Sequence, residues 1–549
     1  MGRTSIGVWR GPKDELVTST AGIRELLHEI RSPLFFVDHG AGRVAVSKSG
    51  TALLGQQEQS DGLPLLAHEQ AIGPENLGDP SFLRDHSLSY PLLGGAMYHG
   101  ITSKQMVQAF ARAGMLAFFG AGGLPLAQIE DAVMELKESL GDGVFGVNLL
   151  HSPFEPELEE KTVDLLLERD LRIASASAYT SPSLALLRYR LKGLSTSPDG
   201  RVVARQKIFA KVSREEVARR FFSPPPPDMV AELLRRGSIS EQEAQLASKI
   251  PVAQDITAEA DSGGHTDNQP FITMLPTMLA LCKAQQELHS FASPLRVGVG
   301  GGISTPSAVC AAFSMGAAYV MTGSINQSCQ EAGTSDRVKE MLCQVSQGDV
   351  TMAPAADMFE MGVKVQVLKR ATMFPMRATK LWELYRNHSS LDEIPGVERQ
   401  KLEKTVFKKS IDEVWRQTED FFRKRDPRQL EKAQRDEKQK MALVFRWYLG
   451  QSSHWATSGL ESRRVDYQIQ CGPSMGAFNE WCRSTFLQGP EQRQVSLLSL
   501  NLLTAASILT RLRSLSLKGI ELAEEVSSIA PMRADELMKR LDKSIDGLQ

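Results

Sequence analysis

The stretch of sequence that decides the fold is Arg296-Val297-Gly298-Val299-Gly300-Gly301-Gly302-Ile303-Ser304-Thr305-Pro306. Its first half is typical of a short buried strand. The glycines that follow predict a tight turn, because glycine adopts positive φ without a steric penalty. Thr305 suits the cap of a helix and Pro306 suits the first helical position, so we expect a helix to begin there. The stretch is therefore one strand–turn–helix joint of a parallel β/α array.

The same alternation of short apolar runs and amphipathic stretches recurs on both sides of this joint. Expected strands are 91–95, 115–119, 144–148, 173–177, 208–212, 252–257, 296–300 and 318–322. Expected helices between them are 103–113, 126–140, 155–169, 181–190, 268–288 and 306–314. Eight units within roughly 250 residues are typical of a closed barrel, whereas an open doubly wound sheet would not need that length. The predicted fold class is α/β, a (β/α)8 TIM barrel.

Three further regions surround the predicted barrel, which we place at 90–350. Residues 1–89 form a small N-terminal appendage, with a helix at 23–30, strands at 34–37 and 44–46, and loop-rich sequence up to Pro80. An insertion at about 220–250 begins with four prolines and predicts two short helices at 229–236 and 241–249, as a lid or small subdomain over the site. Residues 351–549 form a helical region, with helices expected at 397–423, around 441–450 and at 495–512.

Composition narrows the possible partners. The chain has 549 residues, and 63 Lys and Arg against 65 Asp and Glu give a net charge of -2, so no overall field favours nucleic acid or anionic lipid. Six cysteines without metal-binding spacing are typical of reduced thiols. The first residues lack the apolar core of a secretory signal, and 495–512 is too polar and short for a membrane span. We expect a cytoplasmic protein that binds small molecules or proteins, and that is a homodimer.

Two glycine clusters predict a phosphate site. In a β/α barrel the active face lies at the carboxyl ends of the strands, and a phosphate often binds the loops after strands seven and eight. Gly300, Gly301 and Gly302 fit the first loop, and Gly323 with Ser324 fits the second. The alternative is an ordinary glycine-rich turn. A dinucleotide fold fits poorly, because Ile303 occupies the third glycine position of the G-x-G-x-x-G pattern.

Other strand ends supply candidate contacts to a flat heterocycle. Gly95, Ala96 and Met97 would let the main chain lie against a ring, with a soft apolar wall. Asn148 suits hydrogen bonding to a heterocycle edge, although a turn-forming Asn is an equal alternative. Lys211 suits an anionic reduced ring, and a salt bridge at the barrel mouth is equally compatible.

The run Asp261-Ser262-Gly263-Gly264-His265 follows the sixth strand and supplies the candidate catalytic group. A near-neutral pKa suits His265 to proton transfer, although a lone histidine is often structural. The predicted face carries no competing carboxylate pair, metal cluster or nucleophile constellation.

At these residues the chain resembles the flavin-dependent barrels of the nitronate monooxygenase group. The shared pattern appears here as Gly146-Val147-Asn148, Asp261-Ser262-Gly263-Gly264-His265, Gly301-Gly302-Ile303 and Gly323-Ser324. The last is a departure, since the group has Gly-Thr there, but serine keeps the hydroxyl. Bacterial FMN-dependent enoyl-ACP reductases share the pattern.

Longer sequence segments show a second resemblance, which extends over nearly the whole chain. They are 210–218, 259–269, 323–327, 358–368, 445–450, 466–468 and 471–473. These segments are similar to those of the trans-acting enoyl reductases of polyunsaturated-fatty-acid synthases and related polyketide synthases. The resemblance implies that NADPH or NADH reduces FMN, and that a hydride then passes to the β-carbon of an enoyl thioester on acyl carrier protein. By position we assign the α-carbon proton to His265.

Three other functions stay open. The same barrel suits a nitronate-type flavin oxidase with His265 as base. The large helical region suits a non-catalytic structural component of a synthase complex. A phosphate-binding barrel without flavin is the fourth possibility.

Overall fold

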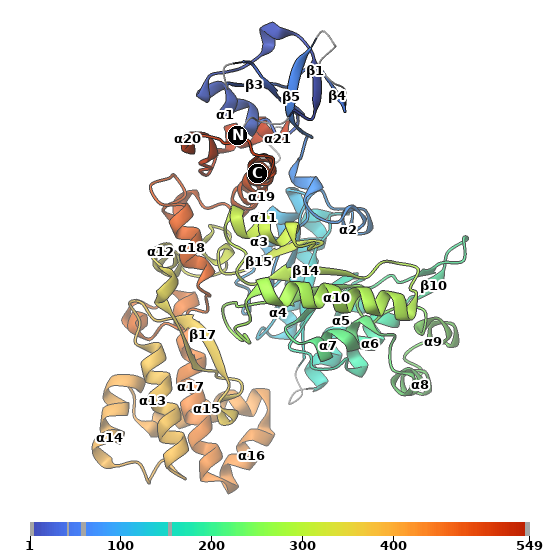
Figure 1. Cartoon of the computed structure of the whole chain (residues 1–549). Helices are drawn as coiled ribbons and strands as arrows, with labels where there is room; N and C mark the ends of the chain where they lie inside the picture. Colours follow the sequence, from blue (N-terminus) through green and yellow to red (C-terminus); the bar gives the residue numbers. More distant parts are fainter. Residues whose placement is uncertain (1–4, 41–42, 56–61, 152–155, 544–549) are drawn as a thin grey trace.

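A closed barrel of eight parallel strands forms the centre of the computed structural model, which describes residues 5–40, 43–55, 62–151 and 156–543 (Figure 1). Its strands are β6 (Leu92–Gly94), β7 (Leu116–Phe119), β8 (Gly146–Leu150), β9 (Ile173–Ser177), β12 (Lys207–Val212), β13 (Asp255–Glu259), β14 (Arg296–Gly300) and β15 (Val320–Thr322). β15 pairs with β6, and β9 pairs with β12, so the sheet closes on itself. The predicted TIM barrel is confirmed.

The sixth predicted strand, 252–257, is displaced in the structure, where β13 begins only at Asp255. The amides of Val252 and Ala253 donate to the carbonyl oxygens of Ser223 and Phe221, at 3.0 and 2.9 Å. These two residues are therefore held by the segment at the end of a helix and do not join the barrel ladder.

Helices cover the outside of the barrel. They are α3 (Lys104–Arg112), α4 (Leu126–Leu140), α5 (Pro156–Glu168), α6 (Leu184–Leu191), α7 (Glu215–Phe222), α10 (Phe271–His289) and α11 (Pro306–Ser314). The expected cap is present on α11, where the Thr305 side chain accepts a hydrogen bond from the amide of Ala308 and Pro306 is the first helical residue. The helix that would follow the eighth strand is replaced by one from the far end of the chain, α19 (Val495–Leu517), which packs on α11 and α3.

Within the described residues, α19 is the one helix long and apolar enough to cross a membrane, with a mean hydropathy of 1.5 in its most apolar window. That window is 89% buried inside the protein. Its apolar character is therefore explained by its place in the core.

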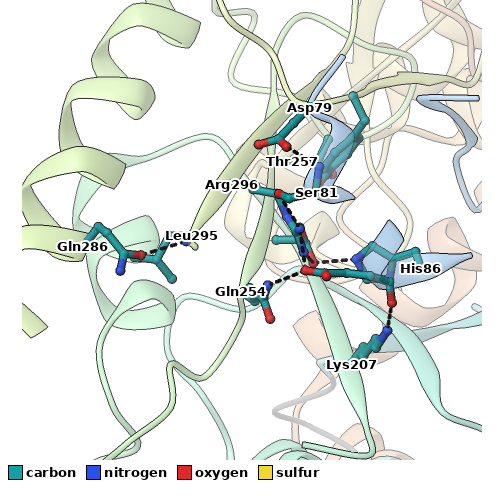
Figure 2. A network of polar contacts seen from close by, with 12 residues as sticks. Asp79, Ser81, His86, Lys207, Gln254, Thr257, Gln286, Leu295 and Arg296 are labelled. Atoms are coloured by element: carbon teal, nitrogen blue, oxygen red, sulfur yellow. Dashed lines mark hydrogen bonds and ion pairs between the residues drawn. The ribbon is translucent and has the colours of Figure 1, made fainter. Parts of the chain in front are cut away.

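An ionic network closes the amino-terminal end of the barrel, against α2 (Pro80–His86) (Figure 2). The fully buried Asp255 carboxylate lies 2.7 Å from Arg296 Nε and 2.9 Å from His86 Nε2. Arg296 also contacts the half-exposed Asp85 at 2.7 Å. Burial would raise the pKa of Asp255, but the charges and hydrogen bonds of His86 and Arg296 outweigh it and lower the pKa to about 2. These ion pairs therefore close the amino-terminal end of the barrel. The carboxyl-terminal end remains for a ligand.

The inserted segment contains the expected helices, α8 (Pro227–Arg235) and α9 (Glu241–Ala247), but it is not a lid. Both helices pack against α6, and α9 contacts the small hairpin of β10 (Ser195–Thr196) and β11 (Val202–Val203). The amide of Gly193, just after α6, donates to Glu243 of α9. Figure 1 shows these helices on the side of the barrel away from β17. The lid hypothesis was wrong because the chain returns down α7 to the closed end before the insertion starts.

The N-terminal appendage is more ordered than the sequence indicated. It is a five-stranded antiparallel sheet in the order β3-β2-β5-β1-β4, with α1 (Thr20–His28). The strands are β1 (Gly7–Arg10), β2 (Leu34–Asp38), β3 (Val44–Ser47), β4 (Thr51–Leu54) and β5 (Leu63–Glu69). Arg511 of α19 is buried and donates to four carbonyl oxygens of this region, those of Leu27, Glu29, Ser32 and Gln70. The N-terminal appendage and α19 are thus joined, and Figure 1 shows them side by side.

The C-terminal region is mainly helical, as expected. Besides α19, its helices are α13 (Phe374–Asn387), α14 (Gly396–Lys401), the π-helix η6 (Leu402–Phe407), α15 (Ile411–Arg425), α16 (Pro427–Arg435), α17 (Glu437–Ser458), α18 (Ser474–Trp481), α20 (Glu524–Ser527) and α21 (Ala534–Leu541). α12 (Asp336–Cys343) lies just before this region. The helix predicted at 397–423 is divided, because Lys408 has a φ of 53° and Ser410 caps a new helix.

Short 3-10 turns occur throughout the described residues. They are η1 (Lys13–Glu15), η2 (Pro74–Asn76), η3 (Asn326–Ser328), η4 (Gln347–Asp349), η5 (Phe359–Met361), η7 (Glu461–Asp466) and η8 (Pro490–Gln492).

One hairpin in the C-terminal region was not expected. β16 (Val350–Pro354) and β17 (Lys364–Leu368) pair antiparallel. β17 also bridges to the barrel loop at Gly264 and to Gln470. The hairpin therefore lies directly at the open end of the barrel.

Candidate functional site

The candidate residues lie together at the carboxyl rim of the barrel, because all eight strands run in one direction. Gly95, Ala96 and Met97 follow β6; Asn148 and Lys211 lie in β8 and β12; Asp261, Ser262, Gly263, Gly264 and His265 follow β13; Gly300 ends β14, and Gly301 and Gly302 follow it; and Gly323 and Ser324 follow β15. This rim is the open end of the barrel, opposite the end that the ionic network closes. The residues therefore form one candidate active site.

The turn after β6 is fixed by one hydroxyl. Thr102 Oγ1 donates to the carbonyl oxygen of Gly95 at 2.8 Å and accepts from the amide of Met97 at 2.9 Å. Ala96 packs on the aromatic cluster inside the barrel. The small residues expected at this strand end are therefore held in one shape.

Polar side chains pair at the mouth. Lys211 Nζ lies 2.7 Å from Glu259 Oε1, and both side chains are mostly buried. Asn148 Oδ1 accepts from Ser177 Oγ at 2.9 Å. Of the two interpretations of Lys211, this structure has the salt bridge, and its partner is Glu259, to which the sequence had suggested no role.

The glycine loop after β14 adopts the shape that only glycine tolerates. Gly301 has a φ of 87°, and a Cβ there would lie 2.5 Å from the carbonyl oxygen of Ala260. Gly302 has a φ of 73°. The loop leads through the Thr305 cap into α11, so the positive end of this helix points back at the loop.

Gly323 differs from these glycines. A Cβ built on Gly323 would have no neighbour within 4 Å. The hydroxyl of Ser324, by contrast, accepts a hydrogen bond from the amide of Gly472 at 3.1 Å, so it already has one partner from the C-terminal region.

Gly263 and Gly264 are explained by packing within the chain. A Cβ on Gly263 would lie 2.6 Å from Cys471 Cα, and Gly264 has a φ of 83°. Gly264 and Gln366 exchange both backbone hydrogen bonds, at 2.9 and 2.7 Å. The close approach that these glycines permit is therefore to the C-terminal region, and their part in cofactor binding stays a prediction.

Asp261 and Ser262 differ in how their side chains are used. Asp261 Oδ1 accepts from Asn268 Nδ2 at 2.9 Å and from Gln366 Nε2 at 2.8 Å, so it organises the loop. Ser262 Oγ is buried and finds no hydrogen-bond partner among the described residues. A buried hydroxyl without a partner is costly unless a ligand or water satisfies it.

His265 contacts a carboxylate that the sequence analysis missed. Its Nε2 lies 3.0 Å from Asp357 Oδ2, in the segment that joins β16 to β17, and the side chains are 45% and 62% exposed. Burial lowers the pKa of His265, but the hydrogen bond and charge of Asp357, with a smaller effect of Glu259, outweigh it and raise the pKa above 6.5. The same bond lowers the pKa of Asp357, against the effect of burial. The imidazole is thereby biased toward its protonated form.

Asp357 and Gln366 were missed although a signal existed. Both lie in or beside the similar sequence segment at 358–368, and Val365 and Val367 alternate with polar residues as in a strand. Sequence alone did not show that this strand crosses to the barrel loop 100 residues earlier.

Known proteins share both parts of this arrangement. Residues 81–384, more than half of the chain, match the nitronate monooxygenase family. Residues 388–467 match the family described as acyl-carrier-protein S-malonyltransferase, inserted helical domain.

Two relatives are proteins of fatty acid synthesis and polyketide biosynthesis. A polyunsaturated fatty acid synthase protein of Thraustochytrium sp. is 44% identical over 447 residues, which is 80% of this chain and 30% of that protein. Polyketide biosynthesis protein PksE of Bacillus subtilis is 44% identical over 450 residues, 82% of this chain and 58% of that protein. The chain thus spans less than two thirds of the length of either relative.

A solved structure resembles the chain over almost the whole of its own length. The enoyl reductase domain of MlnA, from the macrolactin biosynthesis cluster of Bacillus amyloliquefaciens, is 40% identical with a TM-score of 0.77. The match covers 80% of this chain and 99% of that domain. This chain therefore belongs to the nitronate monooxygenase family of flavin barrels; it also carries the inserted helical domain at residues 388–467 and is similar to the MlnA enoyl reductase domain over 99% of that domain.

Proposed function

We propose that this chain is an FMN-dependent enoyl reductase. It reduces the 2,3 double bond of enoyl thioesters on acyl carrier protein, with NADPH or NADH as the reductant. The observation that carries the proposal is the likeness to the MlnA enoyl reductase domain over 99% of that domain. The relatives from fatty acid and polyketide synthases support a carrier-bound substrate.

The rim suits a flavin phosphate and ring. No described atom lies within 4 Å of a Cβ built on Gly323, which leaves room for a ligand; the buried Ser262 Oγ lacks a partner among the described residues, and the amino end of α11 favours an anion. When bound, FMN supplies the hydride chemistry between the nicotinamide and the β-carbon of the enoyl thioester. Ser262 and the loops at Gly301 and Gly323 would hold it.

His265 would protonate the α-carbon. Its Nε2–H donates to Asp357, so Nδ1 is the atom left for proton transfer. After the hydride reaches the β-carbon, the electron pair of the double bond moves toward the thioester carbonyl, and the proton from Nδ1 completes the saturated product. The neutral imidazole that results still donates through Nε2, so the Asp357 contact survives the step.

The nitronate oxidase is the second candidate, and the family match over residues 81–384 favours it. There the histidine removes a proton and must be neutral. The Asp357 contact raises the pKa of the imidazole, which favours the protonated form that an acid needs but also makes the neutral ring a stronger base. The pairing is therefore compatible with both candidates, and the likeness to the MlnA domain is what favours the reductase.

Anaerobic turnover distinguishes the two candidates. The purified protein is expected to show a flavin absorption spectrum and to oxidise NADPH or NADH without oxygen when a crotonyl thioester is added. A flavoprotein that ignores this thioester but consumes oxygen with alkyl nitronates would defeat the proposal in favour of the oxidase. A colourless protein that binds no FMN would defeat both.

Gly323→Ala tests the cofactor site without disturbing the fold. The added methyl meets no described protein atom within 4 Å, so the free energy of unfolding should change by less than about 0.5 kcal/mol. If FMN occupies this space, crowding of about 1–3 kcal/mol should weaken its affinity by about 5- to 150-fold. Fluorescence titration of the apoprotein with FMN measures the Kd.

Gly396→Ala is the matched control, because a Cβ there is equally free of neighbours and Gly396 lies at the start of α14, away from the rim. It should leave the Kd for FMN unchanged. Equal affinities of the two variants would remove Gly323 from the cofactor site.

A further inference from the structure

The β16–β17 hairpin is fastened to the loop that carries His265. Gln366 of β17 forms both backbone hydrogen bonds with Gly264, at 2.9 and 2.7 Å. Its side-chain Nε2 donates to Asp261 Oδ1 and to the carbonyl oxygen of Ser262, both at 2.8 Å. One glutamine therefore holds three residues of the loop next to the histidine.

The same hairpin supplies the partner of the imidazole. Asp357 lies in the connection between the two strands and contacts His265 Nε2 at 3.0 Å. Because Gln366 fixes the loop and Asp357 contacts the ring, the hairpin determines both where His265 sits and which ring nitrogen faces the ligand.

Other charged groups near His265 already have partners. Glu259 raises the pKa of His265 by a smaller amount than Asp357 does, and its carboxylate is paired with Lys211 at 2.7 Å. Asp261 is bound by Gln366 and Asn268. Asp267 accepts from Arg214 and Ser213. Asp357 is therefore the carboxylate whose removal changes the surroundings of the ring most directly.

We propose that Asp357 is the positioning residue of His265, and that the β16–β17 hairpin of the C-terminal region thereby forms part of the active site. The proposal rests on the proposed function for its catalytic consequence, but the contact itself is measurable in the resting protein. Both side chains are half-exposed, so solvent weakens their interaction in the open site. A carrier-bound substrate and its cofactor displace that water and strengthen it.

Asp357→Asn removes the charge and keeps the shape. In the full-length protein, the pKa of His265 measured by NMR titration of labelled histidines is expected to fall by about half a unit, the size typical of an exposed pair. The His265→Gln spectrum assigns the resonance. In anaerobic turnover of a crotonyl thioester, the alkaline limb of the kcat profile should move down by at least half a unit, because the acid must be protonated and kcat reports the substrate-bound protein, in which the contact is stronger. Above both pKa values kcat should then be at least about threefold lower, with KM nearly unchanged.

Glu360→Gln is the matched control. Glu360 lies in the same connection but pairs with Arg446 at 3.0 Å, so neither the NMR titration nor the kcat profile should move. Asp357→Glu should restore the wild-type titration at least in part. An unchanged titration of His265 in Asp357→Asn, or an equal shift in Glu360→Gln, would overturn the proposal. A shifted titration in a protein without enoyl reductase activity would refute the proposed function while leaving the contact established.

Discussion

Replacement of His265 by glutamine is expected to lower kcat for anaerobic enoyl reduction by about 10²–10⁴-fold, the usual contribution of a general acid. Glutamine occupies a similar volume and can still contact Asp357, but it has no proton to give at neutral pH. Because His265 lies on a loop held by Gln366 and Asp261, the substitution should leave the fold intact. Rapid-mixing kinetics should therefore show normal reduction of the flavin by the nicotinamide and a slow second half-reaction with the crotonyl thioester.

The control is His68→Gln, which changes a histidine stacked on Phe35 in the N-terminal sheet. It should retain the wild-type rate. A rate within about threefold of wild type in His265→Gln would mean that the proton comes from water or another group. If a reconstituted synthase that contains the His265→Gln variant forms its product at the unchanged rate, the hypothesis of a non-catalytic structural component is supported.

Asp255→Asn is expected to lower the free energy of unfolding by about 3–5 kcal/mol, the cost of breaking a buried pair. The substitution leaves the buried guanidinium of Arg296 and the ring of His86 without their shared carboxylate at the closed end of the barrel. Denaturant unfolding at pH 7 measures the effect. The rim lies at the other end, so FMN affinity should be unchanged.

The destabilisation should depend on pH with a definite sign. The pKa of Asp255 in the folded protein is about 2, below the ordinary value of 3.8, so its contribution is fully present above pH 4 and is lost as the pH falls toward 2. The shift of nearly two units corresponds to about 2 kcal/mol of the difference between the wild type and Asp255→Asn. That part should disappear over this interval.

Asp85→Asn provides the comparison, because Asp85 contacts the same Arg296 from a side chain that is 40% exposed. It should cost no more than about 1 kcal/mol. Equal effects of the two substitutions would show that burial of Asp255 adds nothing.

The barrel and its rim were predictable because their signals are local. Each strand is short and apolar, each joint carries its own turn and cap, and parallel strands bring their carboxyl ends together without further information. The loop at Gly300–Gly302 and the cap at Thr305 illustrate this. The buried α19 was recognised as a helix, but its position as the barrel's eighth covering helix depends on a return over 170 residues of chain.

The features that the sequence did not predict share a physical cause. β1 lies between β4 and β5, so its partners are distant in sequence and each strand has only a few residues. Asp357 and Gln366 are ordinary polar residues until the hairpin meets the loop at Gly264. The sequence singled out the glycines of that loop as cofactor contacts, whereas the neighbour for which Gly263 makes room in the structure is Cys471.

The hydrogen bonds beside β17 have a consequence for building chimeras between this chain and its relatives. The amide of Leu368 donates to the carbonyl oxygen of Ile469 at 2.8 Å, so the helices between them leave and return at one seam. Gly472 then reaches Ser324. A chimera cut at the end of the barrel would strip the His265 loop of its support, whereas a graft that swaps only the helices between Leu368 and Ile469 would leave the hairpin and its contacts to that loop in place.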